Sequence, residues 1–118
     1  MERPKNYFSD EELMEFKELL LQKREKTVSQ ILEFDKQLRE LTENGKDENS
    51  LDNASYESQM DYLVSYRERN EKHLSDIDKA LIRIQNKTYG ICMITGALID
   101  KNRLLAVPTT TKSIEAKK

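Results

Sequence analysis

The stretch MDYLVSYRERNEKHLSDIDKALIRI, residues 60–84, repeats its apolar side chains with the spacing of a coiled-coil helix. Steps of three and four residues alternate along one seam, which is formed by Met60, Leu63, Arg67, Asn70, Leu74, Ile77, Leu81 and Ile84. This heptad pattern predicts a helix from about residue 53 to 87 that packs against a second helix. Two seam residues are polar: Arg67 and Asn70 either fix the register or bend outward, or they form a weak point.

A matching helix precedes this one in the chain. Ser9 and Glu12 have the spacing of a capping box, and Phe8 and Leu13 occupy the positions of a hydrophobic staple. The helix is therefore predicted to begin at Ser9, and no glycine or proline interrupts the chain up to about residue 43. A single apolar stripe follows three- and four-residue steps and contains Leu20, Thr27, Ile31, Phe34, Leu38 and Leu41.

The segment between the two helices, ENGKDENSLDNAS at residues 43–55, is rich in small polar residues and predicts an exposed hairpin tip. Folding the chain there pairs residues whose numbers sum to about 101, so that Leu38 lies near Leu63. Gly90 is predicted to cap the second helix after Tyr89. The predicted fold is mainly α: a short segment at 1–8, a long antiparallel helical hairpin at 9–88 with its tip at about 44–54, and a small C-terminal head at 89–118.

Composition excludes several classes of protein. The 118 residues are 36% charged, and 20 basic and 22 acidic side chains are mixed along the chain, so no basic field is available for DNA binding. No apolar run has the length of a membrane span, and MERPKNYFSDEE lacks the apolar core of a signal peptide. The prediction is a cytoplasmic protein that binds neither DNA nor a membrane.

Catalysis is not indicated. The single histidine, His73, lies beside the seam without an evident nucleophile, and a solvated or half-packed imidazole is the simpler interpretation. The single cysteine, Cys92, has the apolar neighbours Ile91, Met93 and Ile94, so it is predicted to be a buried packing residue rather than a reactive thiol. One cysteine excludes both an intrachain disulfide and an all-cysteine metal site.

The C-terminal part carries a more specific pattern. ALIRIQNKTYGIC at residues 80–92 is followed by TGALI at 95–99 and RLLAVPT at 103–109, which suggests a short hairpin and then a last turn or helix from Thr111. With the two helices, this pattern resembles the DksA/TraR family of transcription factors over nearly the whole chain.

The resemblance implies a zinc-ribbon frame without its zinc. Members with a four-cysteine finger place their ligands at offsets 0, 3, 21 and 24, which fall here on Cys92, Thr95, Ser113 and Ala116. This set lacks the four donors that tetrahedral zinc needs, so no metal is predicted. The degenerate head is instead predicted to be held together by burial of Cys92, Ile94, Leu98, Ile99, Leu104, Leu105 and Val107.

The resemblance also implies a function. Family members bind bacterial RNA polymerase and insert the hairpin tip into its secondary channel, which alters promoter-complex stability. The family's tip motif, Asp-x-x-Asp-x-Ala, falls on residues 49–54: Asp52 and Ala54 match, whereas Asn49 replaces the first aspartate. The alternative is a structural helical-hairpin adaptor that has lost the regulatory activity. A self-paired hairpin is predicted to be a monomer.

The alarmone of the stringent response, ppGpp, has a family site whose basic positions fall here on Asp76, Val107 and Lys117. Only one of these three residues is a cation, and Asp76 would repel a polyphosphate. The resemblance therefore leaves the dependence on ppGpp open, and we expect weak or absent synergy at that site.

Overall fold

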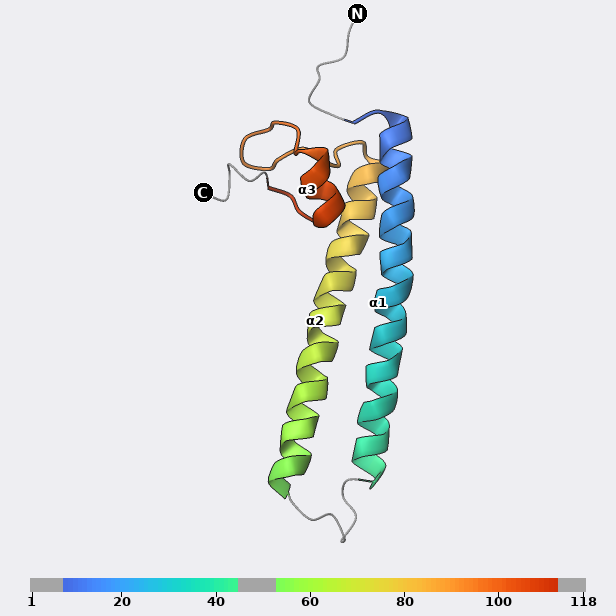
Figure 1. The fold of residues 1–118 in the computed structure, drawn as a ribbon, viewed down its shortest axis with the longest axis vertical. Helices are drawn as coiled ribbons and strands as arrows, with labels where there is room; N and C mark the ends of the chain where they lie inside the picture. Colours follow the sequence, from blue (N-terminus) through green and yellow to red (C-terminus); the bar gives the residue numbers. More distant parts are fainter. Residues whose placement is uncertain (1–7, 45–52, 113–118) are drawn as a thin grey trace, which may run out of the picture. The chain divides into compact units, whose positions relative to one another are not determined.

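The structure is a computed structural model that describes residues 8–44 and 53–112. It contains helix α1 (Asp10–Asn44), helix α2 (Asn53–Gln85) and the short helix α3 (Lys101–Ala106), as drawn in Figure 1. Ion pairs between α1 and α2, such as Arg24 with Asp78 and Asp35 with Arg67, join the two antiparallel helices. The predicted mainly α fold with a long helical hairpin is confirmed. Within the described residues, no helix is long and apolar enough to cross a membrane.

The start of α1 is the one predicted from the sequence. The backbone N–H of Ser9 donates to the carboxylate of Glu12, and the N–H of Glu12 donates to the Ser9 hydroxyl, each at 3.1 Å. These two bonds lower the pKa of Glu12. Phe8 and Leu13 are both buried on either side of the cap. A capping box and a hydrophobic staple therefore fix the point where the chain enters the helix.

The end of α2 differs from the prediction. The helix ends at Gln85, and the cap is not Gly90 but Lys87, which adopts a left-handed φ of 62°. The N–H of Lys87 donates to the Ile84 carbonyl at 3.0 Å, and the N–H of Thr88 donates to the Arg83 carbonyl at 2.8 Å. This pair of bonds is a Schellman motif, which satisfies the last carbonyls of the helix and is usually built on glycine.

Replacing Lys87 with glycine is expected to raise the free energy of unfolding by about 0.5–1 kcal/mol, because glycine adopts positive φ without the steric penalty of a Cβ atom. The ion pair lost with Asp10 joins two largely exposed side chains at 3.4 Å and is worth little. Urea denaturation measures the change. Lys87→Ala is the control, since it removes the same ion pair and keeps the Cβ. Equal stability of the two variants would show that the Cβ at residue 87 carries no steric penalty at this positive φ.

The chain forms two compact units. The terminal unit combines Met1–Arg24 with Asp76–Lys118, and the central unit is Glu25–Ser75. The division cuts through both long helices, after Arg24 in α1 and after Ser75 in α2, whereas α3 belongs wholly to the terminal unit. The domain boundaries predicted from the sequence stay predictions.

The hydrophobic core lies in the terminal unit. Eleven buried residues form one cluster there: Phe8, Leu13, Phe16, Leu20, Ile77, Ala80, Ile84, Tyr89, Cys92, Ile99 and Leu104. Phe16 lies between two other rings, with ring centroids 5.3 Å from Phe8 and 5.2 Å from Tyr89. The first three turns of α1 and the last three of α2 therefore pack together with the C-terminal segment around an aromatic centre.

The C-terminal segment only partly follows the prediction. Cys92, Ile99 and Leu104 are buried and Leu98 packs against the cluster. The predicted core residues Ile94, Leu105 and Val107 are instead exposed, with 64%, 51% and 44% of their surface accessible. The predicted hairpin is reduced to a single antiparallel bridge between Ile91 and Leu98, and residues 103–106 belong to α3.

Helix α3 explains why Leu105 is exposed. Because a helix of six residues presents only one narrow face to the core, Leu104 occupies that face and its neighbour Leu105 points away. The Tyr89 hydroxyl donates to the Pro108 carbonyl at 2.7 Å and holds the chain after α3 against the core. Burial raises the pKa of Tyr89, so this hydroxyl stays protonated. The predicted helix from Thr111 falls mostly outside the described residues.

Candidate functional site

The predicted tip lies largely outside the described residues. Asn49 and Asp52 belong to the segment 45–52, and Ala54 lies in the first turn of α2 without a described side chain. The structure does describe the two helix ends that carry the tip, which are the end of α1 at Asn44 and the start of α2 at Asn53. The assignment of the tip residues therefore stays a prediction.

The seam of the central unit has the predicted positions. Every predicted seam residue from Thr27 to Leu41 and from Met60 to Leu74 is buried or partly buried. Contacts between the helices join Phe34 with Tyr66 and Asp35 with Arg67. Their residue numbers sum to 100 and 102, so the register agrees with the predicted sum of about 101.

Arg67 makes the contact expected of a residue that fixes this register. Its guanidinium donates across the seam to Asp35 and along its own helix to Glu71. The hydrogen bond with Asp35 is the main reason why the pKa of Arg67 is raised. Asn70 contributes less, because its side-chain amide donates to the Tyr66 carbonyl one turn earlier in the same helix, at 2.9 Å.

A strip of aromatic side chains accompanies the seam and was missed by the sequence analysis. Tyr66 stacks on Phe34 with centroids 5.9 Å apart, and Tyr62 lies 4.5 Å from Tyr66. The guanidinium of Arg69 lies 5.3 Å from the Tyr66 ring centroid, within the range of a cation–π contact. The signal that could have found the strip is the pair of tyrosines four residues apart, which share one helix face.

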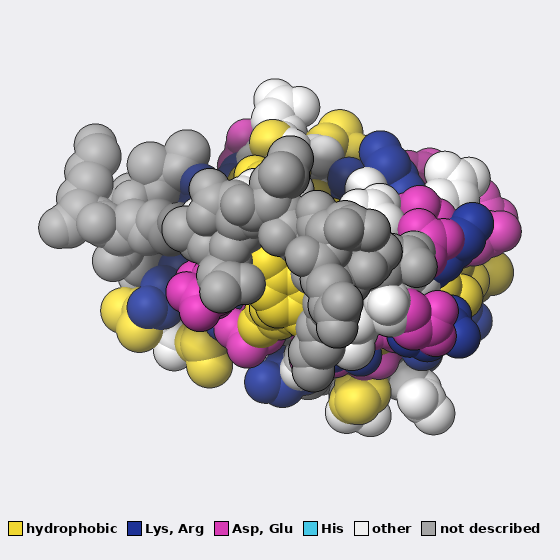
Figure 2. Space-filling model, turned by 90° about the horizontal axis from the view of Figure 1, so that it is seen from below, with side chains coloured by type: hydrophobic (Ala, Val, Ile, Leu, Met, Phe, Trp, Pro, Cys, Tyr) yellow, Lys and Arg dark blue, Asp and Glu magenta, His cyan; other side chains and the backbone are white. Residues whose placement is uncertain are grey.

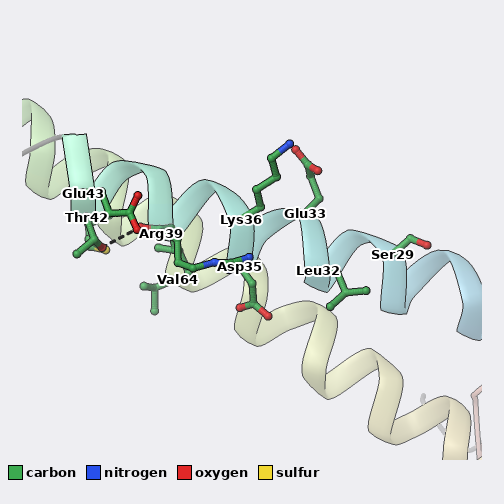
Figure 3. A pocket seen from close by; sticks show the side chains of 11 residues that line it. Ser29, Leu32, Glu33, Asp35, Lys36, Arg39, Thr42, Glu43 and Val64 are labelled. Carbon is green, nitrogen blue, oxygen red and sulfur yellow. Dashed lines mark hydrogen bonds between the residues drawn. The ribbon is translucent and has the colours of Figure 1, made fainter.

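The central unit also has a groove of about 1000 Å³, which is lined by residues of both α1 and α2. Its apolar lining comes from Leu32, Leu38, Met60 and Val64. In Figure 3, Glu33 and Lys36 extend toward one another from α1, whereas Asp35 points toward α2. Thr42 donates its hydroxyl to the Leu38 carbonyl at 2.8 Å.

The residues at the predicted zinc positions do not fit the metal. Cys92 is 1% exposed within the core, and its sulfur accepts the N–H of Thr95 at 3.5 Å. Thr95 is itself exposed, and Ser113 and Ala116 lie outside the described residues. Across residues 8–44 and 53–112, no group of three His, Cys, Asp or Glu side chains is placed to hold a metal ion. The burial of Cys92 is confirmed; the loss of zinc stays a prediction.

The positions implied for the alarmone belong to the terminal unit. Asp76 is partly buried, Val107 is exposed, and Lys117 lies outside the described residues. Burial lowers the pKa of Arg83, while electrostatic interactions with Tyr89 and Asp76 act to raise it. The Asp76 carboxylate thus interacts electrostatically with the Arg83 guanidinium.

Charge on the surface is mixed. In Figure 2, Lys and Arg side chains alternate with Asp and Glu side chains around the visible face, with hydrophobic side chains between them. Among the described side chains visible on this face, none form an extended basic area, which agrees with the balanced composition.

Comparison with known proteins finds transcription factors that are similar to this chain over most of its length. No family model matches the chain. The RNA polymerase-binding transcription factor DksA of Caulobacter vibrioides is 37% identical over 110 residues, which make up 93% of this chain and 76% of the relative. The solved structure of the transcription factor DksA2 from Pseudomonas aeruginosa superposes with a TM-score of 0.86 and 37% identity, covering 98% of this chain and 88% of that one.

A more distant likeness concerns the fold alone. The RNA polymerase binding protein and transcriptional regulator Dks from Chlamydia trachomatis has a TM-score of 0.54 and 24% identity, over 93% of this chain and 87% of that one.

Proposed function

Because this chain belongs to the DksA family, we propose that it binds bacterial RNA polymerase and regulates transcription by inserting its helical hairpin into the secondary channel, where it alters promoter-complex stability. The family consists of transcription factors and not of enzymes, as the sequence analysis predicted. The observation that carries the proposal is the extent of the likeness. It includes both long helices and the C-terminal segment, so it exceeds what two unrelated coiled coils would share.

We assign the tip the role of the effector. Asp52 supplies a carboxylate that reaches cationic side chains or the hydration shell of a Mg²⁺ ion in the polymerase. Ala54 allows close approach of the backbone, and Asn49 supplies a hydrogen-bonding group without charge. The support is the match of residues 49–54 to the family's tip motif and the confirmed register of the helices that flank the tip.

Several further properties complete the proposal. The protein works without zinc, because the core around Cys92 and Leu104 takes over the stabilising role of a metal. It acts in the cytoplasm as a monomer, contacts the polymerase rather than DNA, and depends weakly or not at all on ppGpp. Support for the weak alarmone dependence is the acidic Asp76 and the uncharged Val107 at two of the three implied positions.

Asp52→Asn is expected to reduce the effect of the protein on transcript yield roughly tenfold or more, since a hydrogen bond to a charged group is worth about 1.5–3 kcal/mol. Binding to polymerase should persist, because the helices are unchanged. Multi-round in vitro transcription from a ribosomal RNA promoter with the cognate polymerase measures the effect. Asp47→Asn is the matched control: it removes an acidic group from the same segment outside the motif and should leave the effect intact.

Other outcomes separate the two candidate functions. If the native protein binds polymerase and both variants act equally, the effector residue is wrongly assigned. If the native protein neither changes transcript yield nor competes with a second ligand of the secondary channel, the proposal fails, and the hairpin is a structural adaptor.

A further inference from the structure

The two units are packed very differently. The terminal unit has the cluster of eleven buried hydrophobic residues. In the central unit, among residues 25–43 and 55–75, only Leu63 and Thr27 are buried. Because burial of apolar surface is the main stabilising contribution to folding, the central unit has far less to hold its two helices together.

The seam of the central unit also contains polar residues at its middle. Arg67 and its partner Asp35 are about one third exposed, so their ion pair is screened by water and stabilises the helix pair only weakly. Asn70 gives its amide to its own helix and leaves no hydrogen bond across the seam among the described residues. Polar groups at such positions specify the register at the expense of stability.

Grooves adjoin this part of the seam. One has a volume of about 1000 Å³ and another, next to Phe34, Tyr66 and Asn70, has a volume of about 390 Å³. Large apolar side chains that line the larger groove remain in contact with water: Leu32 is 62% exposed and Val64 is 37% exposed. The space between the two helices is therefore incompletely filled, and dispersion contacts are lost along it.

We propose that the α1 and α2 segments of the central unit separate from one another while the terminal unit stays folded. We call this separation opening, and we propose that bound RNA polymerase reverses it. The reversal, or closing step, rests on the function proposed above. The two helical segments of the central unit, about 20 residues each, depend on packing against one another, because tertiary packing of an amphipathic face supplies most of the stability of helices in proteins. Segments with few buried apolar contacts form the low-stability part of a protein.

Hydrogen exchange of the free full-length protein tests the opening. Amides in the middle of the central helical segments, residues 29–42 and 57–72, are expected to show protection at least roughly tenfold lower than amides of residues 13–20 and 77–84. Low concentrations of urea should narrow this difference, because global unfolding exposes more surface than opening of the central unit alone and therefore depends more steeply on urea. Equal protection and equal urea dependence in all four segments would show that the helices open only together and would overturn the proposal.

A repacked seam provides the matched variant. Replacing Arg67 and Asn70 together with leucine is expected to raise the protection of the central segments roughly tenfold and leave the terminal segments unchanged. Lys72→Leu is the control, because Lys72 is exposed and lies off the seam, so it removes a cation without filling the seam. A repacked variant with the protection of the native protein would contradict the role assigned to the polar seam.

The closing step is measured by adding RNA polymerase. The protection of the central segments should rise at least roughly tenfold in the complex, since the partner binds the closed form. Unchanged protection in a complex that has formed overturns the closing step. If no complex forms by size-exclusion chromatography, the proposed function fails instead, while the opening of the central unit is still decided by the exchange of the free protein.

Discussion

Gly90→Ala is expected to lower the free energy of unfolding of the terminal unit by about 2–5 kcal/mol. Gly90 has a φ of 83°, where a Cβ atom costs about 1–2 kcal/mol. That Cβ would also lie 2.4 Å from Cε2 and 2.5 Å from Cδ2 of Phe8. The Phe8 ring is buried and packs against Phe16, so overpacking adds about 1–3 kcal/mol.

Gly96→Ala is the matched control for this substitution. Gly96 has a similar φ of 74°, but no atom lies within 4 Å of the position that its Cβ would take. Its substitution should therefore lower stability by only about 1–2 kcal/mol, which is the backbone term alone. Urea denaturation followed by circular dichroism compares the two variants. Equal losses would mean that Phe8 moves aside without cost. The contact between the new Cβ and the Phe8 ring would then contribute nothing to the loss of stability.

Phe16→Ala is expected to lower the free energy of unfolding by about 3–5 kcal/mol, as for other large-to-small substitutions of buried aromatic residues. Phe16 is 1% exposed and touches the rings of both Phe8 and Tyr89. The cavity would open at the centre of the only large core among the described residues, where neighbouring elements from three parts of the chain meet. Urea denaturation of the native protein and the variant measures the loss.

Phe34→Ala is the corresponding control in the central unit. Phe34 is only partly buried and makes one stacked contact with Tyr66, so its loss should lower stability by about 1 kcal/mol. The effect should also be confined to the hydrogen exchange of the central helices. A loss as large as that of Phe16→Ala would place a second core in the central unit and would contradict the packing contrast described above.

The helical hairpin could be predicted because each of its signals is local or periodic. The capping box needs only Ser9 and Glu12, and the seams need only three- and four-residue spacing. The end of α2 could not be predicted as readily. Glycine is the usual residue at such a cap, which favours Gly90, but the helix ends at Gln85 and the non-glycine residue Lys87 takes the left-handed conformation.

The C-terminal segment shows where apolar composition misleads. Ile94, Leu105 and Val107 look like core residues in the sequence, yet a single bridge and a six-residue helix offer too little regular structure to bury them all. The core is completed instead by Phe8, Phe16 and Tyr89, whose proximity depends on tertiary packing. No periodic pattern within the segment carries that information.

Less of the candidate site could be derived from the residues themselves. The register that positions the tip follows from the seam pattern, and the pair of Arg67 with Asp35 agrees with it. The role of Asp52 rests on the family motif alone, since an acidic residue in a polar connection has no distinctive physical signature. The strip of Tyr62 and Tyr66 lies off the seam, so the heptad pattern alone does not predict it.

The composition of the core sets an order for folding during synthesis. Phe16 leaves the ribosome about 70 residues before Tyr89, its partner in the aromatic centre. At translation rates of about 5–20 residues per second, this delay is roughly 4–14 s. Until Ile77 and the residues after it emerge, the apolar side chains of Leu13, Phe16 and Leu20 have no native partner from the later part of the chain. The nascent protein therefore offers an unprotected hydrophobic helix face to chaperones until the end of α2 has emerged.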